Sequence, residues 1–450
     1  MCCGHSPVTF AAGTLGSGFG LSFAETCAVL IPVNLLTCLL IGYFGCLGPM
    51  TGLRMMSIGR FALGVWGSRA LMVLGGCALL GWASVNSIAG AQILTELSDG
   101  RFPLWAGNLL IGVISAVISF FGYFVIHFFE RYCWAPMLLF FCFMAGYGAE
   151  WFDVSARPLG LDGEPVMAAS PQGVVTFIAV TYSFIAAWSP IVADYYVRMP
   201  HTVSKPKLTL AIGAGQFLGM VIPQVLGAAF MTSFLRNPAY ADAFARLGPG
   251  GLMVQVLVPP LGGFGRFLLV MAGLMGIIGS NLVNNYSLAF TVQNLHPSLL
   301  KVPRPLWTLL ASAVIIAIAI AGSGSFADFL VSFLSVTGYY TTPFMLCVLV
   351  DLFYFRRREG GYPLESWNDM SVIGPGFAGL AALAMGFVGA VLSMNQTWYV
   401  GVVAKAAGGD QGGVELGWIF SGVFSVLAYM PLRHLEIRYM DRRRKSALSG

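Results

Sequence analysis

The chain has 450 residues, of which 57% are hydrophobic and 10% charged, and its net charge is +5. A soluble domain carries about 25% charged residues, so 24 basic and 19 acidic side chains are too few to cover a soluble protein of this length. The mean hydropathy is +0.79. This composition excludes a soluble enzyme, a nucleic-acid-binding protein and a disordered chain, and it indicates a polytopic membrane protein.

Apolar runs long enough to cross a bilayer recur along the whole chain. One helical span needs about 20 apolar residues. We predict twelve spans, of which the first is short and rich in glycine, at residues 7–22, 24–47, 70–96, 105–127, 133–149, 172–193, 208–233, 264–293, 305–322, 327–353, 372–394 and 415–432. The chain is therefore expected to be all-α.

The basic residues indicate how the spans are oriented. If both termini are cytoplasmic, eighteen of the 24 lysines and arginines lie inside, and the other six lie outside, namely Arg101, Arg157, Arg236, Arg246, Arg266 and Lys405. An excess of basic residues in cytoplasmic segments is the pattern of known membrane proteins. We therefore predict cytoplasmic N- and C-termini, with residues 433–450 as a cytoplasmic tail.

Ionisable residues are nearly absent from the middle of the spans. Asp194 follows the sixth predicted span, where we expect it to pair with a nearby arginine such as Arg198. Asp351 lies near the end of the tenth span, where we expect it to pair with the arginines at 356–358. A charge at the middle of the bilayer is costly and marks an ionic cargo or an ion path. If the protein moves a molecule across the membrane, that molecule is thus uncharged, or a coupling ion is held by carbonyl and hydroxyl oxygens.

Amides and tryptophans do occupy mid-span positions. Trp82 and Asn86 are four residues apart, as are Asn281 and Asn285, so each pair shares one helix face. Trp188 precedes Ser189-Pro190, and the proline predicts a break in the sixth span. Each feature has a structural explanation, since buried amides join helices, tryptophans fill space and prolines kink helices. Their combination favours a transporter with its site between discontinuous helices.

The chemistry of these side chains narrows the cargo. A carboxamide offers a donor and an acceptor in one plane, which matches the edge of a planar heterocycle. An indole face stacks on a base with about 1–3 kcal/mol. Amides and indoles without Arg or Lys therefore fit a flat, neutral cargo such as a nucleobase. They fit an amino acid or a phosphate ester poorly.

Several stretches in chain order resemble one family. They are Gly48–Phe61, Gly81–Asn86, Ala193–Pro200, Asn281–Ser287 and Val302–Arg304. These motifs are similar to those of the nucleobase–cation symporter-1 family, in the wording of its fungal purine–cytosine permease branch. The resemblance covers nearly the whole chain.

The resemblance implies a LeuT-type fold, with two inverted five-helix repeats, two further helices, and discontinuous helices 1 and 6. The repeats would cover 7–149 and 172–353, and the extra helices 372–432. By motif, Trp82 would stack on the base, Asn86 would hydrogen-bond to it, and Trp188 would close its other face. Asn281 and Asn285 would read its polar edge.

The chain departs from the family pattern at three places. Asn284 stands where the fungal branch often has proline. Sodium-coupled members have two adjacent hydroxyl residues before the first Asn of the eighth-helix motif, whereas this chain has Gly279-Ser280. In the cation-site region of Gly276, Gly279 and Ser280 we therefore expect proton rather than sodium coupling, and no cofactor. The first half-helix is expected to be incomplete, with its cargo contacts at about His5 to Thr9.

The leading hypothesis is a plasma-membrane permease that imports adenine, guanine, hypoxanthine and cytosine by proton symport with alternating access. Its partners would be a small nucleobase and the bilayer, with no nucleic acid. One alternative is a permease for allantoin, uracil, hydantoin, thiamine or pyridoxine. Another is a receptor of the same fold without transport. An enzyme is not expected, because the spans hold no paired acids, HExxH motif or Ser/His combination.

Overall fold

The computed structural model describes residues 4–120, 128, 131–155, 157, 169–357, 361–409 and 412–449. The described residues are mainly helical, with a short antiparallel hairpin of β1 (Asn395–Gln396) and β2 (Tyr399–Val400). Six described helical segments are long and apolar enough to cross a membrane, at Phe23–Thr51, Met55–Leu97, Lys205–Met231, Gly263–Leu295, Arg304–Gly322 and Phe326–Phe355. Shorter apolar helices lie at Leu104–Phe120, Pro171–Ala186 and Phe377–Ser393.

The chain divides into two compact units, and each draws on separate stretches of sequence. Unit 1 contains Met1–Leu35, Gly76–Thr181 and Ala214–Phe333, and unit 2 contains Leu36–Gly75, Tyr182–Gly213 and Leu334–Gly450. Long helices such as α2 (Phe23–Thr51) and α3 (Met55–Leu97) contribute to both units. Each unit thus takes residues from both of the predicted inverted repeats, 7–149 and 172–353. The repeats themselves stay a prediction.

Unit 1 is a bundle of helices whose apolar side chains pack together. Besides parts of α2 and α3, its elements in chain order are α1 (Pro7–Gly18), α4 (Leu104–Phe120), α6 (Trp134–Gly148), η2 (Ala149–Trp151), most of α7 (Pro171–Ala186), part of α9 (Lys205–Met231), α10 (Pro238–Leu261), α11 (Gly263–Leu268), η3 (Leu269–Gly273), α12 (Leu274–Leu295), η4 (Pro297–Lys301), α13 (Arg304–Gly322) and the start of α14 (Phe326–Val350).

The short helix α1 packs closely on α9 within unit 1. Ser6 caps α1, since its hydroxyl accepts a hydrogen bond from the Val8 N–H at 3.2 Å. A Cβ added at Gly13 would lie 1.9 Å from the carbonyl oxygen of Gln224, and one at Gly227 would lie 2.2 Å from that of Phe10. Glycine at these two positions therefore lets the two backbones touch.

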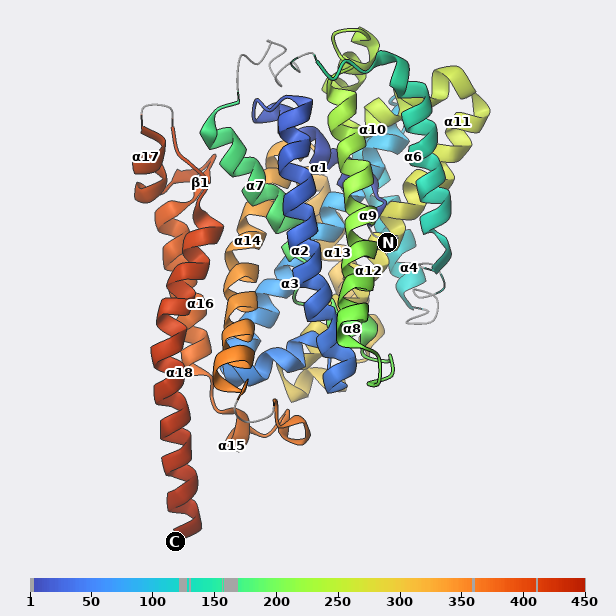
Figure 1. The fold of residues 1–450 in the computed structure, drawn as a ribbon. Coiled ribbons are helices and arrows are strands. Elements are labelled where there is room, and N and C mark those ends of the chain that lie inside the picture. The colour runs from blue at the N-terminus through green and yellow to red at the C-terminus, as the bar shows by residue number, and fades with distance from the viewer. Residues whose placement is uncertain are drawn as a thin grey trace. The chain divides into compact units, whose positions relative to one another are not determined.

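Unit 2 contains the remaining elements. They are α8 (Ala193–Tyr196), η5 (Asp351–Phe355), η7 (Leu364–Ser366), α15 (Met370–Ile373), α16 (Phe377–Ser393), α17 (Val402–Gly408), α18 (Gly417–Ser449), the hairpin, and parts of α2, α3, α7, α9 and α14. Helices α16 and α18 lie side by side (Figure 1), and a Cβ at Gly389 would lie 2.4 Å from the Phe420 carbonyl oxygen. The predicted tail at 433–450 begins inside α18.

Described helices overlap each predicted span, one predicted break is confirmed, and two differences have a local cause. The sixth helix ends at Ala186 and resumes at α8, as the proline predicted. The third begins at Met55 and breaks at Gly64, which has φ +65°. Helix α10 lies between two predicted spans, where three internal prolines and a bend at Leu247-Gly248 mask its periodicity. The end of the fourth span, 121–127, lies outside the described residues.

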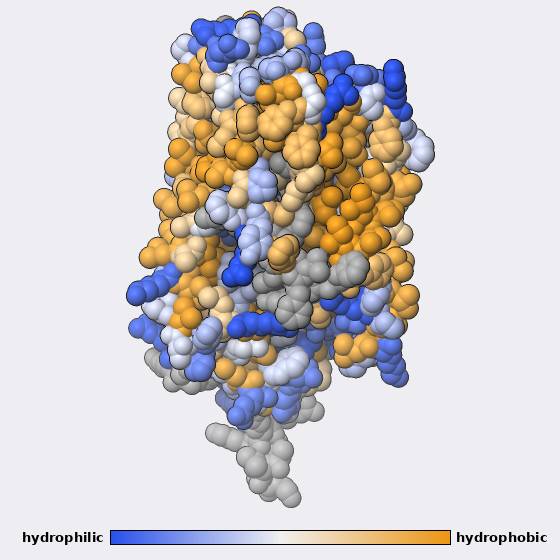
Figure 2. All heavy atoms as spheres, turned by 90° about the vertical axis from the view of Figure 1, so that its right-hand side faces the viewer, coloured by the Kyte–Doolittle hydropathy of each residue, from blue (hydrophilic) through white to orange (hydrophobic). Residues whose placement is uncertain are grey.

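The surface carries many large apolar side chains, among them Leu139, Phe264, Phe267 and Val270. Figure 2 shows hydrophobic residues across the middle of one face and hydrophilic residues toward both of its ends. Large exposed apolar patches mark a membrane or a protein interface. A hollow of about 410 Å³ between α6 and α9 has mostly apolar walls, including Leu138 and Val221, and it contains none of the predicted site residues.

Candidate cargo site

Helix α3 presents a polar face inside unit 1. Asn86 is only 3% exposed, and its Nδ2 donates a hydrogen bond to Oδ1 of Asn281 on α12, at 3.1 Å. Nδ2 of Asn281 donates in turn to the hydroxyl of Ser87, also at 3.1 Å, and that hydroxyl donates to the Ala83 carbonyl. The hydrogen-bonded chain joins two helices and fixes the planes of both amides.

Asn285 lies one helical turn beyond Asn281 on α12 and is 2% exposed. Its Oδ1 is fully buried and accepts no hydrogen bond from any described residue. A buried acceptor without a donor costs about 1–3 kcal/mol. Such an atom is suited to accept a hydrogen bond from a cargo N–H, and it distinguishes Asn285 from the satisfied Asn281.

Trp82 stands one turn before Asn86 on α3. Its half-buried ring meets the edge of Phe333 at the start of α14, with centroids 5.2 Å apart and planes at 83°. A Cβ at Gly81 would lie 2.2 Å from that same phenyl ring, so glycine makes room for it. A T-shaped contact of this kind is one of the arrangements that aromatic pairs prefer.

The predicted cation-site region lies at the amino half of α12. The hydroxyl of Ser280 donates to the Gly276 carbonyl at 3.0 Å. A Cβ at Gly276 would lie 2.9 Å from the carbonyl oxygen of His5, which itself is 2% exposed. Glycine at 276 therefore brings α12 against the segment that precedes α1.

Trp188 belongs to unit 2, in the turn that follows α7. The carbonyl of Trp188 accepts hydrogen bonds from the N–H groups of Ile191 and Val192, at 3.1 and 2.9 Å. Its half-buried ring meets Tyr195 edge-on at 6.4 Å. The helix break predicted from Pro190 is thus confirmed, and it places Trp188 in a turn held by its own hydrogen bonds.

Two residues of this site escaped sequence reasoning. Ser87 anchors Asn281, but one serine beside an asparagine is too common to stand out. Phe333 supports Trp82 from 251 positions along the chain. Five residues were predicted to bind the cargo, and the structure places Trp82, Asn86, Asn281 and Asn285 in unit 1 and Trp188 in unit 2.

The sequence matches a family of known transporters. Residues 1–404 match the family described as permease for cytosine/purines, uracil, thiamine, allantoin. The chain belongs to this family. The permease is 34% identical to the purine-cytosine permease fcyB of Emericella nidulans, over 96% of its own length and 83% of that protein. It is 31% identical to the purine-cytosine permease FCY2 of Saccharomyces cerevisiae, over 96% and 81%.

A solved structure shares the fold of the permease. Mhp1, a nucleobase-cation-symport-1 family transporter in a closed conformation with bromovinylhydantoin bound, superposes with a TM-score of 0.70 at 17% identity. The match covers 98% of the permease and 91% of Mhp1. The permease is therefore an all-α, multi-pass membrane protein with the LeuT-type fold predicted from its motifs. Its relatives are permeases and not enzymes, as predicted.

Proposed function

We propose that the permease imports purine bases and cytosine, namely adenine, guanine, hypoxanthine and cytosine, by proton symport with alternating access. The observation that carries this proposal is the buried Oδ1 of Asn285, which has no donor among the described residues and lies beside the joined amides of Asn86 and Asn281. A base edge supplies the N–H that this oxygen needs. The purine-cytosine permeases among its relatives support the same cargo.

Each predicted residue keeps a role in this proposal. Asn285 accepts a hydrogen bond from the base, and the remaining donor and acceptor capacity of Asn86 serves the same edge. Asn281 holds Asn86 in place as well as reading that edge. Trp82 offers an indole face for stacking. The family motif assigns Trp188 to the same cargo.

The proposal favours protons over sodium as the coupling ion. Sodium is held by several oxygen atoms, and here the residue before Ser280 is Gly279, which brings no hydroxyl. The hydroxyl hydrogen of Ser280 is donated to Gly276. We place the protein in the plasma membrane with both termini cytoplasmic, in line with the distribution of its basic residues.

Uptake of radiolabelled cytosine and adenine in a cell without its own permeases tests the proposal. We expect saturable uptake that rises as the external pH falls, that a protonophore abolishes, and that persists when sodium is replaced by choline. Absence of saturable, pH-dependent uptake of both bases contradicts the proposal. Surface expression is measured in the same cells, because an unexpressed protein would give the same zero.

A second candidate is a permease for another flat heterocycle. The family description, which names uracil, thiamine and allantoin besides cytosine and purines, favours it, and so does Asn284 at the position where proline is frequent. Competition of labelled cytosine uptake by allantoin, uracil, hydantoin, thiamine and pyridoxine separates the two candidates. Binding of a base without any uptake would instead indicate the non-transporting receptor.

A further inference from the structure

Helix α3 starts with a short segment, residues 55–63, that ends at a sharp break and is called the loop helix here. Gly64 has φ +65°, and a Cβ there would lie 2.2 Å from the Cα of Gly376. Across the break, the N–H groups of Val65 and Trp66 donate to the carbonyls of Gly374 and Pro375 instead of continuing the helix. The carbonyls of Phe61 and Ala62 therefore lose their helical donors.

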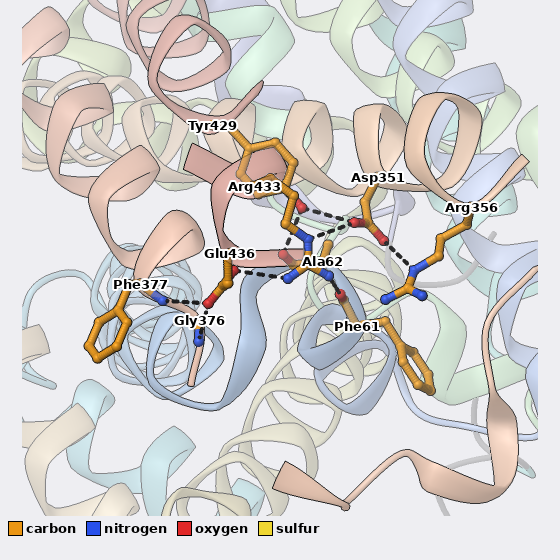
Figure 3. A network of polar contacts seen from close by, with 9 residues as sticks. All are labelled: Phe61, Ala62, Asp351, Arg356, Gly376, Phe377, Tyr429, Arg433 and Glu436. Carbon is orange, nitrogen blue, oxygen red and sulfur yellow. Dashed lines mark hydrogen bonds and ion pairs between the residues drawn. The ribbon is translucent and has the colours of Figure 1, made fainter. Parts of the chain in front are cut away.

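Helix α18 supplies the missing donors. Nη2 of Arg433 donates to the Phe61 carbonyl at 2.6 Å, and the hydroxyl of Tyr429 donates to the Ala62 carbonyl at 2.7 Å. Figure 3 shows both side chains reaching the end of the loop helix. Arg433 is 1% exposed. A guanidinium buried at a helix carboxyl end complements the negative end of the helix dipole.

The same guanidinium joins a buried network in unit 2 (Figure 3). Its Nε lies 3.2 Å from Oδ1 of Asp351, and its Nη1 lies 3.0 Å from Oε2 of Glu436. Glu436 also accepts from the N–H groups of Gly376 and Phe377, which open α16. The expected pairing of Asp351 with Arg356 is confirmed at 3.6 Å. Arg433 thereby joins α18 to η5 and to the loop helix, and its partner Glu436 joins α18 to the start of α16.

The other end of the loop helix is held by a second buried carboxylate. Oδ1 of Asp194 accepts from the Met55 N–H at 2.8 Å, and its Oδ2 lies 3.8 Å from Arg54. The side chain of Asp194 is 8% exposed. Asp194 lies six residues after Trp188, and the ring of the adjacent Tyr195 meets that of Trp188.

We propose that Arg433 is a positioning residue for transport: it holds the carboxyl end of the loop helix, whose amino end holds Asp194 and with it the turn that carries Trp188. The loop helix spans about 13 Å at 1.5 Å per residue, so it is short enough to act as a rigid rod. Coupling between distant sites is carried by packed side chains, hydrogen-bond networks and rigid secondary elements that have two discrete arrangements. The C-terminal helix α18 thus controls the place of an aromatic residue assigned to the cargo.

Hydrogen exchange in the purified full-length protein tests the mechanical part. The variant Arg433→Met/Asp351→Asn removes the Arg433–Asp351 ion pair as a whole, because an unpaired buried Asp351 would destabilise the fold by itself, while Glu436 keeps its hydrogen bonds from the Gly376 and Phe377 N–H groups. We expect amides in 55–63 and also in 193–196 to exchange about tenfold faster or more, as when a charged hydrogen bond is lost. Arg438→Ala, an exposed arginine on the same helix, should change neither. Unchanged exchange at 193–196 in the double variant overturns the proposal.

A mutant cycle on uptake tests the functional part, which rests on the proposed function. We measure the KM for cytosine in Asp194→Asn, in Arg433→Met/Asp351→Asn and in their combination, at matched surface expression. Independent distant sites combine to within about twofold. Here we expect the change in KM of the combined variant to be smaller, by about threefold or more, than the product of the changes in the two component variants. The reason is that releasing either end of the loop helix already frees the Trp188 turn.

The outcomes of the two measurements are distinguishable. If the change in KM of the combined variant equals the product of the two separate changes, the variants have two independent structural defects. That result overturns the role of Arg433 in positioning. If the unmodified chain takes up no base at all, the proposed function fails, while hydrogen exchange at 193–196 still decides whether the loop helix couples its two ends.

Discussion

Asn86 and Asn281, separated by 195 residues of sequence, are joined by a hydrogen bond of 3.1 Å between Nδ2 of the first and Oδ1 of the second. This bond connects α3 to α12 at two positions that family motifs assign to the cargo. Because each amide is held by the other, neither is free to rotate its donor and acceptor. A preorganised polar edge costs little ordering entropy on binding.

Replacing the amide of Asn86 or Asn285 should strongly reduce the uptake of cytosine. Either alanine variant removes a hydrogen bond to a buried polar cargo, at about 1–3 kcal/mol, which is roughly a 5- to 150-fold loss of affinity. Asn108→Ala is the matched control, since Asn108 is buried elsewhere in unit 1 and donates to the Ala319 carbonyl. It should lower the melting temperature without changing KM. Unaltered cytosine affinity in Asn86→Ala or Asn285→Ala would show that the cargo binds elsewhere.

Ser87→Ala should weaken the cargo site without destroying it. The substitution removes the acceptor for Nδ2 of Asn281, so the amide chain loses one anchor worth about 0.5–1.5 kcal/mol. We expect KM for cytosine to rise roughly 2- to 10-fold, with surface expression retained. Ser84→Ala removes a buried hydroxyl from the same helix, one that donates to Leu80 and Ile315. If both serine variants raise KM equally, Ser87 has no special link to the amides.

Glu415→Gln should destabilise unit 2. The Glu415 residue is 0% exposed. Its carboxylate accepts four hydrogen bonds, from the Tyr339 hydroxyl, the Gln396 side-chain amide and the backbone N–H groups of Asn395 and Gly417. A glutamine turns one acceptor into a donor that faces other donors. We expect a loss of about 1.5–3 kcal/mol, seen as a lower melting temperature. The exposed Glu365→Gln is the control, and an equal effect of both would refute the special role of Glu415.

Gly64→Ala should prevent normal accumulation of folded protein. Gly64 has φ +65°, and its added Cβ would overlap Gly376 at 2.2 Å. Gly52→Ala is a close control, because Gly52 has φ +66° but nothing within 4 Å of an added Cβ. Backbone strain alone costs about 1–2 kcal/mol, so Gly52→Ala should be milder. Comparable amounts of folded protein, measured by size-exclusion chromatography, would show that the contact at Gly376 relaxes easily.

The sequence by itself determined the membrane class and the break before Pro190, whereas its twelve spans stay a prediction beside the six long apolar helical segments among the described residues. These features are local: apolar length marks a span, and a proline removes a donor wherever the chain goes. Helical spacing likewise put Trp82 with Asn86, and Asn281 with Asn285, because residues four apart share a face in any α-helix. The family motifs then supplied the fold, which the likeness to Mhp1 confirms.

Only the tertiary structure decided which distant groups meet. Asp194 pairs with Arg54, which is 140 residues away in sequence, whereas Arg198, four residues away, was the partner expected. Arg433, expected at the start of a cytoplasmic tail, is buried and donates to the Phe61 carbonyl 372 residues away. Such contacts depend on how helices pack, and neither hydropathy nor periodicity encodes a partner hundreds of residues distant. The cost of an unsatisfied buried polar group selects these partners, and that cost arises only once the chain has folded.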